Sequence, residues 1–169
     1  MIPYDEAKRR LLEAVGPVEA VEVALEDAAG LVLAESVEAD RDWPPTDRSA
    51  MDGFAVRSVD AREPGRTLSV VGEMPAGRSA EGVAIGPGEA VKIMTGGSVP
   101  GGADAVVMVE RTREDRAAGT VTLYEAAEAG RHVRGRGTEA RRGDVLLRAG
   151  APIHAAEAGI LAAVGRMRV

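Results

Sequence analysis

The segment Arg41-Asp42-Trp43-Pro44-Pro45-Thr46-Asp47-Arg48-Ser49-Ala50-Met51-Asp52-Gly53-Phe54 divides the chain into two regions of different character. Its adjacent prolines cannot continue a helix or a central strand, and the Ser, Asp and Gly residues that follow are typical of an ordered loop. Before it the chain is strongly acidic, because residues 1–42 hold eleven acidic and four basic residues, a net charge of −7. We therefore place a domain boundary near residue 42.

The acidic region before this segment is expected to begin with a helix. Residues Tyr4 to Val15 place Leu11 and Leu12 with other apolar side chains on one face, and Gly16-Pro17 would stop the helix. Apolar and polar residues then alternate weakly over residues 21–25, which favours a short strand.

The region after the segment has the pattern of a β domain. Short apolar runs are separated by turn-rich links, and this spacing is typical of a small barrel or sandwich. The predicted strands are residues 55–56, 68–71, 90–94, 105–109 and 121–123. Near the end we expect a strand over 144–147, a helix over 155–164, and the opening of another strand at 167–169.

Composition excludes several classes of protein. The 169 residues are 45% hydrophobic and 28% charged, as in a folded protein of one ordinary or two small domains. A net charge of −6 and only four aromatic residues argue against a nucleic-acid binder. Without Cys there is no disulfide framework and no thiolate metal site. We expect no membrane span and no signal peptide, and hence a cytoplasmic protein.

Three acidic residues of the dividing segment, Asp42, Asp47 and Asp52, are the first candidates for a functional site. A stiff loop that offers Ser49 and Asp52 beside Gly53 can hold a cation through oxygen ligands or orient a polar ligand. The alternative is that Asp47 and Asp52 cap turns by accepting backbone N–H groups.

Two further stretches are candidates for binding an anion. Thr95-Gly96-Gly97 follows an apolar run, so it is either a set of backbone amides for an anion or an ordinary exit from a strand. The run Arg131 to Arg142 holds five Arg and one Glu, a net charge of +4. It either binds phosphate or carboxylate, or pairs with the acidic N-terminal region. The isolated His132 and His154 are expected to be structural.

Several motifs together resemble one known family. Asp47 to Val56 resembles the D-N-S-A-M-D-G-Y-A-V signature of the molybdopterin molybdenumtransferase family, which includes MoeA and the gephyrin E domain. Further matching stretches follow the family's order along the chain, and they are residues 25–34, 91–96, 102–108, 134–137 and 143–146. The resemblance covers essentially the whole chain but only the N-terminal region of the family protein.

The resemblance implies a mainly β fold with a few helices and two parts. An elongated α+β domain would form from both chain ends, residues 1–42 and 140–169, and a β-barrel-like domain, residues 43–139, would be inserted between them. It also implies an enzyme, a transferase that inserts molybdate into adenylylated molybdopterin and releases AMP with the help of Mg²⁺. The chain would act in a homodimer, whose cleft lies between the inserted domain of one subunit and the molybdopterin domain of the other. Other molybdenum cofactor biosynthesis proteins are further expected partners, and we expect this region alone to be inactive.

The family motifs also assign the expected site residues. By the resemblance, Asp52 and Glu139 orient a cation or accept protons, and Thr95 donates to an anionic oxygen. The residues expected to bind substrate are Ser49, Asp47, Arg134 and Arg136, and the metal ligands are unknown. The sequence departs from the family pattern where Arg48 replaces Asn, Phe54 replaces Tyr, Gly135 replaces Arg and Thr138-Glu139 replaces Glu-Asp. The alternative function is a non-catalytic dimerisation or protein-binding module on the same scaffold.

Overall fold

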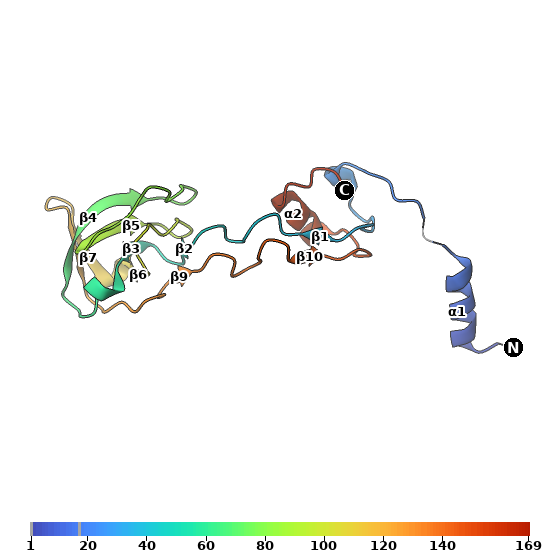
Figure 1. Cartoon of the computed structure of the whole chain (residues 1–169), viewed down its shortest axis with the longest axis horizontal. Helices are drawn as coiled ribbons and strands as arrows, with labels where there is room; N and C mark the ends of the chain where they lie inside the picture. Colours follow the sequence, from blue (N-terminus) through green and yellow to red (C-terminus); the bar gives the residue numbers. More distant parts are fainter. Residues whose placement is uncertain (1, 17) are drawn as a thin grey trace. The chain divides into compact units, whose positions relative to one another are not determined.

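The computed structural model describes residues 2–16 and 18–169 of the chain. Its fold is mainly β with two α-helices, as the sequence predicts (Figure 1). In chain order the elements are α1 (Tyr4–Ala14), η1 (Leu25–Asp27), β1 (Val37–Glu38), β2 (Arg48–Ser49), β3 (Gly53–Val56), η2 (Ser58–Asp60), β4 (Thr67–Met74), β5 (Glu89–Ile93), β6 (Ala105–Met108), η3 (Val109–Arg111), β7 (Thr112–Asp115), β8 (Thr120–Leu123), β9 (Val133–Arg134), β10 (Val145–Leu147) and α2 (Ala155–Ala163).

The chain divides into two compact units, and the outer unit contains both of its ends. The outer unit comprises Met1–Val37 with Val145–Val169, and the inserted unit comprises Glu38–Asp144. These bounds lie a few residues from the expected ones, and the assignment of residues 1–42 with 140–169 and 43–139 as domains stays a prediction.

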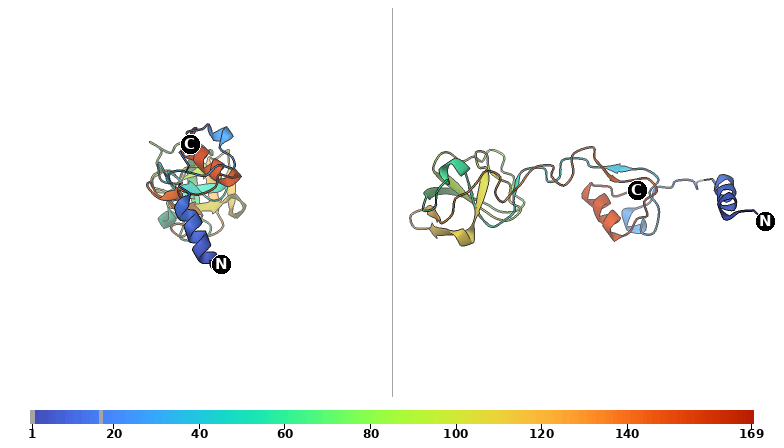
Figure 2. Two further views of the ribbon diagram at one scale, coloured as in Figure 1. Left: turned by 90° about the vertical axis from the view of Figure 1, so that its right-hand side faces the viewer. Right: turned by 90° about the horizontal axis from the view of Figure 1, so that it is seen from below.

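A curved six-stranded sheet forms the centre of the inserted unit (Figures 1 and 2). Its strand order is β6-β3-β5-β4-β8-β7, with β4 and β5 parallel and the other neighbours antiparallel. β3, the second strand in this order, is buried at all four positions, and it pairs with β5 on one side and β6 on the other. Phe54 packs on one side of the sheet with Leu68 and Leu123, and Ala55 packs in a separate cluster with Met74 and Ile93. The inserted unit therefore has its own apolar core.

The outer unit has a second core built from distant parts of the sequence. Leu33 and Val37 pack there with Leu161 of α2, and α2 lies beside η1 (Figures 1 and 2). Val23 and Val169 exchange backbone hydrogen bonds of 2.8 and 3.0 Å, so the two segments predicted as weak strands pair with each other. The His154 backbone N–H donates to the Glu157 carboxylate at 3.0 Å, which caps the start of α2, and the structural role expected of the His154 side chain stays a prediction.

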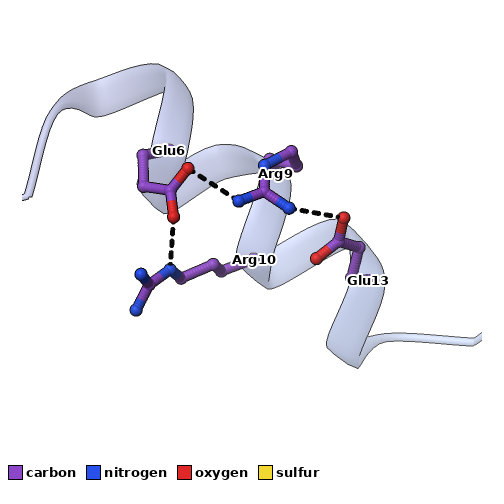
Figure 3. A network of polar contacts seen from close by, with 4 residues as sticks. All are labelled: Glu6, Arg9, Arg10 and Glu13. Carbon is purple, nitrogen blue, oxygen red and sulfur yellow. Dashed lines mark hydrogen bonds and ion pairs between the residues drawn. The ribbon is translucent and has the colours of Figure 1, made fainter.

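Helix α1 carries a network of charged side chains on one face. Glu6 accepts from Arg9 at 2.7 Å and from Arg10 at 2.7 Å, and Arg9 also donates to Glu13 at 2.8 Å (Figure 3). These contacts join residues three or four apart, the spacing that brings side chains together on a helix. None of the helix residues is buried. The helix ends at Ala14, close to the predicted end, and Pro17, named as part of the stop, lies outside the described residues.

Candidate functional site

The dividing segment is held between two other segments of the inserted unit. In β2, Arg48 lies opposite Arg134 and Ser49 opposite Val133 of the antiparallel strand β9. On its other side Arg48 forms a bridge to Ser98, and Ser49 donates its N–H to the Gly97 carbonyl at 2.9 Å. The loop that the sequence predicts as ordered is therefore fixed by backbone pairing with partners far along the chain.

Asp52 and Thr95 are brought together in a close pair. One carboxylate oxygen of Asp52 accepts hydrogen bonds from the Thr95 N–H at 2.6 Å and from the Thr95 hydroxyl at 2.7 Å. Gly96 follows Thr95 with a φ of 79°, a left-handed conformation in which the chain turns directly after β5. The two donors from Thr95 lower the pKa of the Asp52 carboxyl, the backbone N–H being the larger cause. Asp52 is thus ionised at neutral pH and held in one orientation.

A cavity of about 360 Å³ lies beside this pair. Thr95 lines it directly, so the Asp52–Thr95 pair is connected to the cavity through the threonine. Its lining comes from the dividing segment, the turn after β5, and the region around β9. The lining residues are Trp43, Pro44, Pro45, Arg48, Ser49, Ala50, Thr95, Gly96, Arg134 and Glu139.

Four of the seven expected site residues line the cavity, namely Ser49, Thr95, Arg134 and Glu139. Arg134 donates to Glu139 at 2.9 Å in a pair that is more than half exposed, since the side chains are 60% and 54% accessible. Ser49 is buried and holds the loop, because its hydroxyl donates to the Met51 carbonyl at 2.5 Å.

The other expected ligand-binding residues, Asp47 and Arg136, contact other groups of the same chain. The Arg136 N–H donates to the Asp47 carboxylate at 2.7 Å, and the Arg136 side chain donates to Asp42 at 2.6 Å. Asp42 also accepts from the Arg142 N–H at 3.0 Å, and these two contacts, the backbone one first, lower its pKa. Both carboxylates hold the Arg-rich loop in place, and for Asp47 this is the capping alternative stated above.

Six of the ten lining residues were not among the expected site residues, and two of these six, Trp43 and Arg48, have side chains with hydrogen-bond donors. Trp43 is the single tryptophan of the chain, and its backbone pairs with Ala140. Arg48 is half-buried, and its Nε is buried without a hydrogen-bond acceptor among the described residues. Its nearest recorded acceptor is the Gly96 carbonyl, 3.5 Å from a terminal nitrogen, which is a weak contact. The place of Arg48 inside a proline-stiffened motif is the sequence signal that could have identified it.

The described residues do not gather a metal site. Nowhere in residues 2–16 and 18–169 do three His, Asp or Glu side chains come close enough together to hold an ion. The carboxylates nearest the cavity, which could serve as metal ligands, already have partners. Asp52 accepts a hydrogen bond from Thr95, and Glu139 pairs with Arg134. The Mg²⁺ implied by the family resemblance therefore does not fit these side chains alone. In the same described part of the chain, no helix has both the length and the apolar character needed to cross a membrane.

A second cavity, of about 490 Å³, is lined by residues of the Asp60–Leu68 segment and the Pro87-Gly88 turn. None of the expected site residues lines it. Asp60 accepts from the Gly88 N–H at 3.0 Å and pairs with Arg57, so its charge is already used within the fold. We regard the cavity beside Thr95 as the candidate site.

Comparison with known proteins gives one consistent result. Residues 2–165 match the family described as "MoeA N-terminal region (domain I and II)". The chain is 39% identical over 170 residues to the molybdopterin molybdenumtransferase of Bacillus subtilis, covering 97% of this chain and 39% of that protein. It is 36% identical to molybdopterin molybdenumtransferase 1 of Mycobacterium tuberculosis, covering 100% of this chain and 43% of that one.

A solved structure is similar over the same extent. The crystal structure of the molybdopterin biosynthesis moeA protein from Pyrococcus horikoshii OT3 matches with a TM-score of 0.90 and 32% identity, covering 100% of this chain and 45% of that one. The chain thus spans about two fifths of the length of the curated relatives that it matches.

Proposed function

We propose, because this chain belongs to the MoeA N-terminal region family, that it supplies one wall of the cleft in which molybdate is inserted into adenylylated molybdopterin with release of AMP. The chain matches the N-terminal region of relatives named molybdopterin molybdenumtransferase. The remaining walls would come from the part of the relatives' length that this chain does not span.

The observation that carries this proposal is the Asp52–Thr95 pair beside the cavity. Two hydrogen bonds from one residue fix the direction of the Asp52 carboxylate and keep it ionised, so it can accept a proton or orient a cation but is not suited to act as an acid at neutral pH. In this geometry the anionic oxygen that receives the Thr95 hydroxyl is that of Asp52. We therefore propose Thr95 as the residue that positions Asp52, and Asp52 as the charged group beside the cavity that would accept a proton or orient a cation.

Glu139 is the second proposed acidic group. It shares the cavity lining with Thr95, and its carboxylate is held by Arg134. An exposed ion pair of this kind is weak and exchanges readily with other charged groups. Ser49, Asp47 and Arg136 stay in the proposal as residues that shape the loops around the substrate. No step is assigned to magnesium, because the described residues offer it no cluster of ligands.

The first test replaces Asp52 in a full-length protein that carries this chain and the missing domains. Asp52→Asn removes the charge and keeps an oxygen that can still accept from Thr95, so stability should change by no more than about 1 kcal/mol. We expect molybdenum insertion, measured as AMP released and cofactor formed, to be lost. Asp115→Asn is the matched control, because Asp115 also accepts a backbone N–H, from Ala118 at 3.0 Å, but that partner does not line the cavity as Thr95 does. Normal insertion by the Asp52 variant would remove Asp52 from the site.

The second test uses the 169-residue chain by itself. Catalysis needs the reacting groups to be held together, and this positioning is worth about 7–11 kcal/mol, much of which is lost with one wall of a cleft. We expect no insertion when the purified chain is incubated with adenylylated molybdopterin, magnesium and molybdate. AMP release above the protein-free blank would show that the complete active centre lies within these residues.

A further inference from the structure

Two arginines face each other at the candidate cavity. The β2–β9 register places Arg48 directly opposite Arg134, and both side chains line the cavity. Figure 1 shows these two short strands side by side. Like charges that are directly opposite on paired strands destabilise the pairing. The fold therefore keeps an unfavourable arrangement of charge at this place.

The charges around the cavity do not balance. Glu139 is the single acidic residue in the lining, and it pairs with Arg134 alone. Arg48 has a buried Nε for which the described residues provide no acceptor, and its contact with the Gly96 carbonyl is long at 3.5 Å. A buried donor without an acceptor costs free energy unless a ligand supplies one. The lining thus carries one excess positive charge and an unused donor, and the ionised Asp52 lies outside it, on the far side of its contact with Thr95.

We propose that Arg48 and Arg134 form a clamp for a tetrahedral oxyanion, the chemistry shared by a phosphate group and molybdate. Guanidinium groups present paired N–H donors that match the oxygens of such an anion, and an anion bound between Arg48 and Arg134 would also offset the repulsion between them. Glu139 is the internal anion that the ligand displaces from Arg134, and its exposed pair is weak enough to be replaced.

The proposal assigns Arg48 a role specific to this chain. The family pattern has Asn at this position, which cannot supply the charge, so Arg48 makes the cavity more selective for anions than the family pattern does. The choice of oxyanion rests on the proposed function, but the binding itself is tested without any molybdenum insertion. Failure of the clamp would therefore leave the Asp52 experiment unaffected.

The experiment titrates the 169-residue chain with sodium phosphate, sodium molybdate and AMP at constant ionic strength. Trp43 reports directly on the cavity as the only tryptophan, and the arginine Nε–Hε signals in a ¹⁵N NMR spectrum follow the guanidinium groups. We expect saturable binding, weakened about tenfold or more by Arg48→Asn. Glu139→Gln should tighten binding because it frees Arg134.

Arg116→Asn is the matched control, because it removes the same charge from a residue that does not line the cavity and whose side chain is 81% exposed. Binding of phosphate and AMP without molybdate would identify a phosphate group as the ligand, and the reverse would identify molybdate. Equal losses in the Arg48 and Arg116 variants would mean diffuse charge attraction and would overturn the clamp. If the amide NMR spectrum shows that the Arg48→Asn protein is unfolded, the Glu139→Gln protein decides instead. An affinity for the anions equal to that of the wild type would then overturn the clamp.

Discussion

Gly53→Ala tests how closely the strands β3 and β6 approach each other. A Cβ at residue 53 would lie 2.0 Å from the Val107 carbonyl oxygen, whereas real Cβ atoms keep at least 3.0 Å. The β3 and β6 backbones would have to separate by about 1 Å, and β5 on the other side of β3 leaves little room. Forced overpacking costs about 1–3 kcal/mol, and each lost backbone hydrogen bond about 1 kcal/mol more. We therefore expect a loss of about 3–4 kcal/mol.

This loss should lower the melting temperature by roughly 6–16 °C. Trp43 fluorescence is the suitable probe, because Trp43 is the only tryptophan and belongs to the inserted unit. Gly72→Ala is the matched control, since it lies in β4 of the same sheet and a Cβ there would meet no atom within 4 Å. Its stability should stay within about 0.5 kcal/mol of the wild type. A Gly53→Ala protein as stable as the Gly72 variant would refute the close approach of β3 and β6.

Two further predictions concern acid and assembly. The lowered pKa of Asp52 means that its bonds to Thr95 stabilise the fold above the ordinary aspartate pKa of about 3.9 and are lost as the pH falls through the lowered value. An NMR titration should show the Thr95 amide signal constant near neutral pH and moving only in strong acid, and movement near pH 6 would contradict this assignment. We also expect a homodimer in sedimentation experiments at roughly tens of micromolar, because a lasting contact needs apolar area and Leu11 and Leu12 of α1 are 66% and 68% exposed. A monomer at that concentration would argue against the dimer, and a dimer unchanged by Leu11→Gln would argue against α1 as its contact.

Much of the regular structure could be predicted from local patterns. The helix at α2 follows from an apolar run closed by Gly165, and β5 and β6 are apolar runs bounded by turns. The strands that were missed have no such local pattern. β7 is the charged sequence Thr-Arg-Glu-Asp at the edge of the sheet, and β2 is only Arg48–Ser49. Such strands form because they pair with other segments of the chain, so the local sequence pattern does not reveal them.

The contacts between the side chains of the site could not be predicted from local sequence either. The motif identified Asp52 and Thr95, but their mutual hydrogen bonds join residues 43 positions apart and depend on the turn at Gly96. The sequence did not single out Arg48 as a site residue. Its position opposite Arg134 arises only from the pairing of β2 with β9. The family motif could thus supply the residues, whereas only the fold shows which of them contact each other.

The pairing of Val23 with Val169 sets an order of events during synthesis of the chain. The outer unit needs residues from both sides of the inserted unit, so its first part must wait on the ribosome until residues 38–144 have been made. At about 5–20 residues per second this delay is roughly 5–20 s. The inserted unit is continuous in sequence and can fold within that time, whereas Leu33 and Val37 stay without their core partners. The nascent chain therefore completes the unit that holds the cavity first, and in the meantime exposes an apolar segment on which chaperones can act.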